Sequence, residues 1–246
     1  SAASHLRQVP CLLLTGHRHP PALQFQNGLS RLPHSRPGAL SVEPKAPLEQ
    51  IAREVAVCPA CVLAKTRTKT VPGDGSPEAE ILFIGEAPGY HEDQQGHPFV
   101  GAAGQFLSEL LASIGLDRSR VFVTNVVKCR PPGNRDPQPD EIQACDHFLR
   151  RQIAAIRPRV IVTLGRFSMG KFFPGETISK IHGQARRRDG VTYVPMYHPA
   201  AALHQPSLRR SIEEDFQKLP QILASVREVP EAPDTAKTNA TQLSLF

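Results

Sequence analysis

The sequence contains no tryptophan and only three tyrosines. Such scarcity argues against a single-strand-binding surface built from rows of stacked aromatic rings. No apolar stretch approaches the ~18 residues that span a bilayer, and the run Leu12–Leu14 is too short for the apolar core of a secretory signal. No G-x-G-x-x-G motif follows a predicted strand, which argues against a redox protein that uses a flavin or nicotinamide.

Acidic residues are scarce at the start of the chain, where none precedes Glu43. Over all 246 residues, 29 Lys and Arg outnumber 23 Asp and Glu, giving a formal charge of +6 and a pI of about 9.3. This balance suits a polyanionic partner. Residues 1–46 are rich in Pro, Arg, His and Ser and have no lasting periodicity, which predicts a disordered extension. Their composition also fits a transit peptide.

Residues 47–226 have the pattern of a globular domain. Apolar, β-branched runs predict strands at Ile81–Ile84, Val121–Val126, Val160–Leu164 and Tyr193–Tyr197. Helical spacing of apolar residues predicts helices at Leu48–Val55, Phe106–Ile114 (stopped by Gly115), Pro139–Ile156 and about Leu208–Val226. This alternation predicts an α/β fold of three layers, α/β/α, around a central, mostly parallel four-stranded sheet. Arg186–Gly190 is typical of a tight hairpin turn.

The five cysteines are an odd number and do not suggest a disulfide framework. Cys58 and Cys61 form a C-x2-C pair, whereas Cys129 and Cys145 lie sixteen positions apart. Soft thiolate ligands select zinc or iron–sulfur clusters, and a four-cysteine zinc site usually has two close pairs. The alternative is two buried free thiols and a stray pair. Cys11 lies in the N-terminal extension and is expected to be a bystander.

The most informative stretch is ILFIGEAPGYHEDQQGHPFVGAAGQFL, at positions 81–107. Its strand ends in a turn of Gly and Pro that carries Glu86, and a polar loop with Glu92 and Asp93 follows. Phe99 then precedes a Gly-Ala-Ala-Gly helix start. Open α/β sheets bind their ligands where strands end, so this cluster predicts a site. The alternative is an ordinary connection between a strand and a helix.

Three further strands also end in polar or special residues, namely Asn125, Gly165 and His198. If the strands are parallel, these residues converge with Glu86 at one edge of the sheet. Each of them also has an ordinary interpretation. A turn cap, a packed surface histidine and a solvated carboxylate are all common.

The stretch at 81–107, the C-x2-C and C-x15-C cysteines and the sequence HPAAAL after the last strand resemble the motifs of the family 4 uracil-DNA glycosylases, across about residues 56–222. The resemblance implies the three-layer fold of that superfamily. It also implies a structural [4Fe–4S] cluster held by Cys58, Cys61, Cys129 and Cys145. The implied activity is monofunctional hydrolysis of the N-glycosidic bond of uracil in DNA, which releases uracil and leaves an abasic site.

The resemblance also assigns residues to recognition of the base. The base must leave the duplex stack to be reached, and Phe99 would then stack on the extruded ring. The Asn125 amide would donate to O4 and accept from N3–H, a pattern that cytosine inverts. Glu92 would be the wall at C5 that rejects the methyl group of thymine.

The same resemblance assigns the chemical step. His198 would donate a hydrogen bond to O2, where negative charge develops. Glu86 and the backbone of Ala87 would lie beside the sugar. Two routes for water remain open: Glu86 acts as the general base, or the oxocarbenium ion captures water unaided.

Contacts with DNA follow from similar reasoning. Leu203, in the loop after His198, would wedge into the space that the base vacates. Arg186, Arg187 and Arg188 would follow the phosphates, although a charged hairpin tip is more often simply solvated. Gly101 and Gly104 at a helix start would let a phosphate approach closely.

Residues 227–246 have the composition of a flexible tail that ends in Gln242–Phe246 (QLSLF). This pentapeptide resembles the motif by which bacterial repair and replication proteins bind the sliding clamp; the alternative is a chance apolar end. We expect a monomer in the bacterial cytoplasm, associated with the nucleoid.

The main rival interpretation is a non-catalytic adaptor, an iron–sulfur DNA-binding module tethered to the sliding clamp. It would explain the cysteines, the charge and the tail. It leaves unexplained the set Glu86, Glu92, Phe99, Asn125 and His198.

Overall fold

The computed structural model describes residues 45–228. Of the predicted extension at 1–46, residues 1–44 and with them Cys11 lie outside these residues, whereas Lys45 and Ala46 begin a helix and are not part of an extension. Of the predicted tail at 227–246, residues 229–246 and with them the motif Gln242–Phe246 lie outside as well. Within residues 45–228, no helix is both long and apolar enough to cross a membrane.

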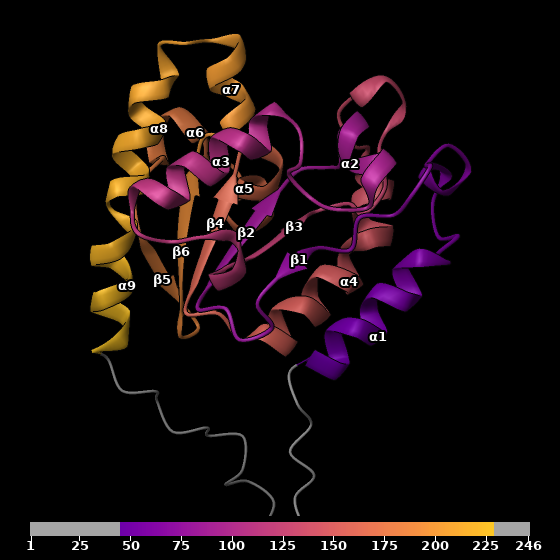
Figure 1. Ribbon diagram of the computed structural model, residues 1–246, viewed down its shortest axis with the longest axis horizontal. Coiled ribbons are helices and arrows are strands. Elements are labelled where there is room, and N and C mark those ends of the chain that lie inside the picture. The colour runs from indigo at the N-terminus through magenta and orange to yellow at the C-terminus, as the bar shows by residue number, and fades with distance from the viewer. Residues whose placement is uncertain (1–44, 229–246) are drawn as a thin grey trace, which may run out of the picture. The chain divides into compact units, whose positions relative to one another are not determined.

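A mixed sheet forms the centre of the described chain (Figure 1). Its strand order is β1-β3-β2-β4-β6-β5. The inner four strands, β3, β2, β4 and β6, are parallel, and each short edge strand is antiparallel to its neighbour. The strands are β1 Asp74–Gly75, β2 Ile81–Gly85, β3 Phe122–Asn125, β4 Val160–Leu164, β5 Arg186–Arg188 and β6 Val191–Met196. The predicted α/β class is therefore confirmed, and the four predicted strands are the inner four.

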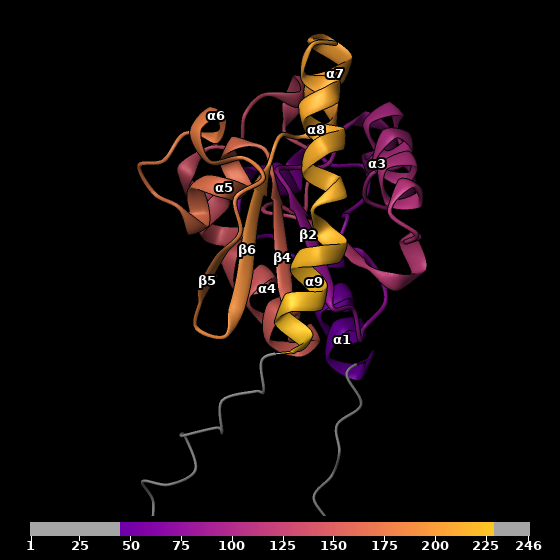
Figure 2. The ribbon, with the colours of Figure 1, turned by 90° about the vertical axis from the view of Figure 1, so that its left-hand side faces the viewer.

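Helices cover both faces of this sheet (Figures 1 and 2). The helices of the described chain are α1 Lys45–Ala56, α2 Tyr90–Gln95, α3 Ala102–Ser113, α4 Pro139–Ile156, α5 Arg166–Phe172, α6 Ile178–Ile181, α7 Pro199–His204, α8 Leu208–Gln217 and α9 Leu219–Arg227. Short 3-10 turns occupy Val62–Lys65, Arg118–Arg120 and Pro132–Asn134.

Alternation along β2 divides the core into two layers. Phe83 packs in a cluster with residues of α3, α8 and α9, and its ring stacks on that of Phe216. Leu82 and Ile84 pack in a second cluster with residues of α4, such as Leu149. Because successive strand residues point to opposite faces, a run of buried apolar residues requires cover on both sides. The burial pattern therefore yields the three-layer arrangement.

The register places the carboxyl ends of the parallel strands together. Gly85 lies opposite Asn125, and Leu164 lies opposite Met196. The residues that follow these strand ends, among them Glu86 and His198, are thus brought to one edge of the sheet, as the sequence predicted.

Two helix predictions need correction. The single helix expected at Leu208–Val226 is two helices, α8 and α9, because Pro220 has no N–H group and its ring excludes the carbonyl four residues earlier. The polar loop expected to carry Glu92 is instead the short helix α2. The carboxylate of Glu92 caps this helix by accepting the N–H of Gly89 at 3.1 Å.

The predicted hairpin is present but shorter than expected. Its arginines form β5, and only Asp189 and Gly190 make the turn. Both turn residues have positive φ angles, 50° and 80°, which is the backbone of a two-residue type I′ hairpin.

Candidate active site

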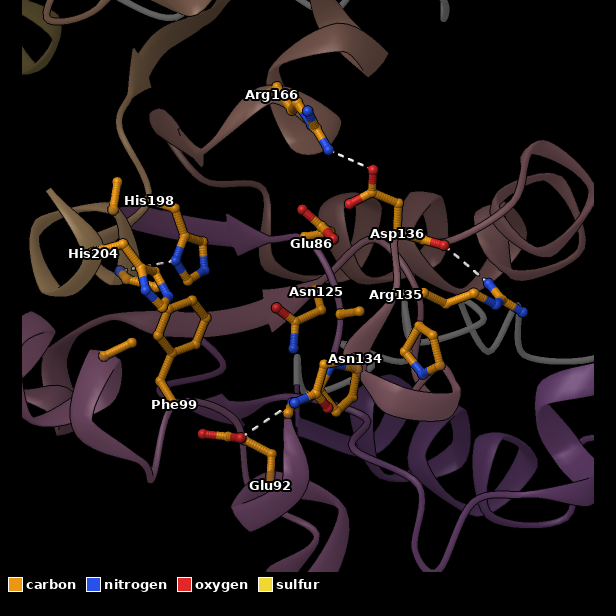
Figure 3. Close-up of a pocket in the computed structure, with 17 residues that line it drawn as sticks. Glu86, Glu92, Phe99, Asn125, Asn134, Arg135, Asp136, Arg166, His198 and His204 are labelled. Atoms are coloured by element: carbon orange, nitrogen blue, oxygen red, sulfur yellow. Dashed lines mark hydrogen bonds and ion pairs between the residues drawn. The ribbon is translucent and has the colours of Figure 1, made fainter.

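A pocket of about 740 Å³ opens at the carboxyl ends of the parallel strands (Figure 3). It is lined by all six residues that the sequence predicted for catalysis and base recognition: Glu86, Ala87, Glu92, Phe99, Asn125 and His198. The volume lies in the range of small-molecule sites. The arrangement brings two carboxylates, an aromatic ring, an amide and an imidazole into one cavity.

Asn125 forms the buried floor of this pocket and is only 2% exposed. Its Oδ1 atom has no hydrogen-bond partner among the described residues. A buried acceptor left unpaired costs free energy, so a ligand with an N–H group directed at this atom would remove that cost. The site is therefore suited to a ligand that donates here.

Gly85 makes room for this arrangement. A Cβ atom at position 85 would lie 2.4 Å from Asn125 Oδ1 and 2.8 Å from Cζ of Phe99. Both distances are shorter than real Cβ contacts. The glycine at the end of β2 thus allows the amide and the aromatic ring to approach each other.

His198 lies at the N-terminus of α7, and its Nδ1 atom accepts the backbone N–H of Ala200 at 3.1 Å. A neutral imidazole that accepts at Nδ1 carries its proton on Nε2. Burial lowers the pKa of His198 to about 4, against an opposing effect of Glu92. At neutral pH His198 is therefore an uncharged donor. Its ring stacks on Phe99, with 5.3 Å between ring centroids.

Glu86 follows β2 and lies on the side of the pocket nearest Asp136 and Arg166 (Figure 3). Burial, followed by the nearby charge of Asp136, raises its pKa to about 7, while Arg166 acts in the opposite direction. A carboxylate with this pKa changes its charge close to neutral pH. That behaviour is typical of groups that transfer protons in active sites.

Glu92 holds the loop that carries Phe99. Its Oε1 atom accepts the N–H groups of Val100 and Gly101, both at 2.9 Å, and its Oε2 atom accepts that of Gly89. The resemblance predicted only a wall against the base. Glu92 does line the pocket, but its carboxylate is occupied by three backbone donors, so the side chain is fixed in place.

Gly101 and Gly104 have different surroundings from those expected of a phosphate site. The N–H of Gly101 is already bonded to Glu92. Gly104 is buried, and a Cβ atom there would lie 1.8 Å from the carbonyl oxygen of Phe99. Gly104 therefore allows α3 to pack against the Phe99 backbone and does not lie open to a ligand.

Leu203 lies beside the pocket, and the three predicted arginines do not. Leu203 is 49% exposed on α7, next to the lining residue His204. The arginines are on the edge strand β5, where Arg188 pairs with Val191 at the start of β6. That end of the sheet is opposite the pocket (Figure 1). Arg186 forms an ion pair with Glu176 at 2.9 Å.

The pocket also contains residues that the sequence analysis missed. Asp136 forms an ion pair with Arg166. Arg135 binds both carboxylate oxygens of the buried Glu141, at 2.6 and 2.9 Å. Arg166 directly follows Gly165, already recognised as a strand end, and this position was a usable signal. Arg135 and Asp136 lie in a Pro-rich loop. Because this loop has no periodic sequence pattern, the sequence does not indicate which way its side chains point.

The four predicted cysteine ligands line one small cavity. They come from the turn after α1, the loop after β3, and α4. Lys128 N–H donates to Cys145 Sγ and Arg67 Nη1 to Cys129 Sγ, each at 3.3 Å. Burial raises the pKa of Cys145 to about 11 and that of Cys129 above its usual range. N–H donors directed at sulfur and an apolar lining suit an iron–sulfur cluster.

A single metal ion and a cluster make different demands on the arrangement of their ligands. Among residues 45–228, no group of three or more His, Cys, Asp or Glu side chains is arranged to hold one ion. A cluster, in contrast, spreads its ligands around several iron atoms. Four thiols around one cavity are a donor set that either kind of centre can use.

Comparison with known proteins shows which family this chain resembles. Residues 72–223 match the family model for the Uracil DNA glycosylase superfamily. The chain is similar to the Type-4 uracil-DNA glycosylase of Sulfurisphaera tokodaii, with 51% identity over 71% of this chain and 84% of that protein. It is also similar to the Type-4 uracil-DNA glycosylase of Archaeoglobus fulgidus, with 50% identity over 71% of this chain and 92% of that protein. The Type-4 uracil-DNA glycosylase of Thermotoga maritima is 43% identical over 70% of this chain and 92% of its own length.

The raised pKa of Glu86 predicts that this residue lowers stability at alkaline pH. Because the pKa is higher in the folded than in the unfolded state, folding disfavours the ionised form above about pH 4.5. We expect Glu86→Gln to raise the free energy of unfolding by about 1–3 kcal/mol at pH 8 and to leave it unchanged at pH 4. Urea denaturation at the two pH values measures this, and an equal effect at both would contradict it.

Proposed function

The chain belongs to the uracil-DNA glycosylase superfamily and, within it, to the type-4 enzymes, and from this we infer that it excises uracil from DNA. It is a hydrolase of the N-glycosidic bond between uracil and deoxyribose. The observation that carries this conclusion for the present chain is the buried Asn125 amide with its unpaired Oδ1, at the floor of a pocket that also holds Phe99 and His198.

Uracil is recognised, in our proposal, by stacking and by the polarity of its hydrogen bonds. The extruded base stacks on Phe99, its N3–H donates to Asn125 Oδ1, and its O4 accepts from the Asn125 amide nitrogen. Cytosine presents the opposite pattern and would leave two buried groups unpaired. Such a mismatch can lower kcat/KM by a factor on the order of 10⁴. Glu92 bounds the C5 side as a fixed group because three N–H donors hold its carboxylate.

The chemical step breaks the bond between C1′ and N1, and the electron pair leaves with the base. Negative charge then builds on O2, where the Nε2–H group of His198 stabilises it. The sugar becomes an oxocarbenium ion, beside which we place the carboxylate of Glu86 and the Ala87 backbone. Water adds at C1′ and loses a proton; a carboxylate with a pKa of about 7 is well matched to accept it near neutral pH.

Contact with DNA involves Leu203, which we propose to enter the space left by the base. Its exposure on α7, next to the pocket, supports this role. We do not extend the proposal to the arginines of β5 or to Gly101 and Gly104, whose surroundings give no such support. Binding of a sliding clamp through Gln242–Phe246, a monomeric state and a place at the bacterial nucleoid stay predictions.

We further propose that Cys58, Cys61, Cys129 and Cys145 hold a [4Fe–4S] cluster. The shared cavity and the N–H donors from Lys128 and Arg67 support it. Such a cluster would act as a covalent crosslink between three segments that lie far apart in the sequence. The protein residues alone would carry the glycosidic chemistry.

The function is tested with end-labelled DNA that contains one uracil, treated with alkali after incubation to cleave abasic sites. We expect strand cleavage at uracil and none with cytosine or thymine at that position. His198→Ala is expected to lower the rate about 10²- to 10³-fold, since one donor to the developing anion is lost. Intact uracil DNA with cluster-loaded protein would favour the non-catalytic adaptor instead.

Asn125→Asp tests how the base is read. The carboxylate can accept from the N4 amino group of cytosine but cannot donate to O4 of uracil. We expect the preference for uracil over cytosine to fall at least ~10²-fold, measured as the ratio of single-turnover rates. Asn134→Asp, at the exposed edge of the same pocket, is the matched control and should keep the ratio. Unchanged rejection of cytosine by Asn125→Asp would contradict the assignment.

The cluster proposal predicts about four iron atoms per chain and broad visible absorbance in protein purified without oxygen. Cys145→Ser should lower the iron content and the melting temperature, because a ligand and the crosslink are lost. Cys11→Ser, outside the proposed ligand set, should change neither. Stoichiometric zinc with little iron would overturn the proposal.

A further inference from the structure

We propose that Tyr90 and Arg130 form a second base-binding site at the pocket mouth, which takes the nucleobase adjacent to the extruded uracil on the same DNA strand. This inference rests on the proposed function, since it assumes that DNA enters the pocket. It assigns a role to two residues that the uracil site does not use.

Tyr90 is an exposed aromatic residue next to the pocket lining. Among residues 45–228, the exposed large hydrophobic side chains are Val57, Val62, Tyr90 and Leu203. Only Tyr90 among them is aromatic, and it is 54% exposed. It directly follows Pro88 and Gly89, which line the pocket, whereas Leu203 approaches the pocket from α7. Helices α2 and α7 lie at the same end of the sheet (Figure 1), and each contributes a residue to the lining of the pocket, Glu92 from α2 and His204 from α7 (Figure 3).

The surrounding contacts hold the Tyr90 ring in place. Tyr90 is the first residue of α2, which Glu92 caps. The guanidinium of Arg130 lies over the ring, with Cζ 5.1 Å from its centroid. Arg130 is fixed in turn, because its Nε donates to Asn134 Oδ1 at 2.7 Å. The edge of the His91 ring completes the group, 5.5 Å away. An exposed aromatic ring is thus built into a polar cluster rather than left free.

The chemistry of this cluster fits a nucleobase next to a phosphate. When uracil leaves the stack, its neighbour loses a stacking partner, and an aromatic ring at the mouth can replace it. Such stacking tolerates any base, and removal of the aromatic ring lowers the affinity by a factor of roughly 5 to 100. Arg130 adds positive charge where the DNA backbone must pass. Since Leu203 is assigned the vacated space, Tyr90 is left for the adjacent base.

The ligand is one base and not a long single strand. The scarcity of aromatic residues argues against a row of stacked rings, and the other two tyrosines, Tyr193 and Tyr197, are only partly exposed. Because every base has a face that can stack on an aromatic ring, this site requires no particular base next to the uracil.

The test combines a protein variant with deletion of a base from the substrate. Single-stranded oligonucleotides carry one uracil, and either neighbouring nucleotide is replaced by an abasic tetrahydrofuran unit. For the intact oligonucleotide, Tyr90→Ala is expected to raise KM roughly 5- to 100-fold, with a much smaller effect on kcat. For the oligonucleotide that lacks the contacted base, Tyr90→Ala and wild type should have similar KM values.

Two further variants separate stacking from other effects. Tyr90→Phe keeps the ring and should return KM to within about threefold of wild type. His147→Ala removes an exposed ring on α4, outside the pocket, and should leave KM and kcat unchanged. Normal uracil release with an unchanged KM in Tyr90→Ala would overturn the second site alone. So would an increase in KM that persists when either neighbouring base is missing. No uracil release by wild type would instead contradict the proposed function.

Discussion

The geometry of the pocket depends on the carboxylate of Glu92. Phe99 has a φ angle of 55°, a left-handed conformation that a bulky residue adopts only when its surroundings enforce it. Glu92 enforces it from one side through the N–H groups of Val100 and Gly101. Arg118 acts from the other by donating to the carbonyl of Pro98 at 2.8 Å. The ring so positioned supports the His198 imidazole, so one partly buried carboxylate fixes the Phe99 ring and, through it, the imidazole.

A second constraint connects the pocket to the cysteine cavity. Lys128 is only 1% exposed, and its ammonium donates to Thr124 Oγ1, the Asn125 carbonyl and Gln152 Oε1, at 2.6–2.8 Å. Its backbone N–H donates to Cys145 Sγ. Within residues 45–228 no carboxylate pairs with this buried charge, which is costly without compensation. Thiolate ligands at the adjacent cavity would supply negative charge. The end of β3 that carries Asn125 and the cavity lined by the four cysteines thus belong to one hydrogen-bonded segment.

The sequence predicted those features that depend on local periodicity or on strand ends. Four apolar runs predicted the inner strands, and the polar residues at or just after the ends of these strands predicted that Glu86, Asn125 and His198 meet at one edge. The edge strands were missed because two or three residues carry no periodic signal. Contacts between distant segments were also missed. Examples are the close packing of Gly104 on the Phe99 carbonyl and the ion pair between Asp136 and Arg166. Such contacts depend on how the loops fold, which the local sequence pattern does not reveal.

The electrostatics of the pocket determine how the base can leave. The same burial that raises the pKa of Glu86 to about 7 lowers that of His198 to about 4, because a low dielectric disfavours charge of either sign. An imidazolium that could protonate uracil is therefore scarce at neutral pH. In the mechanism we propose, uracil therefore departs as an anion that the neutral N–H group of His198 stabilises, while the ionised fraction of Glu86 stabilises the positive charge on the sugar. In this proposal, fixed dipoles and one carboxylate promote departure of the base, and general acid catalysis is not required.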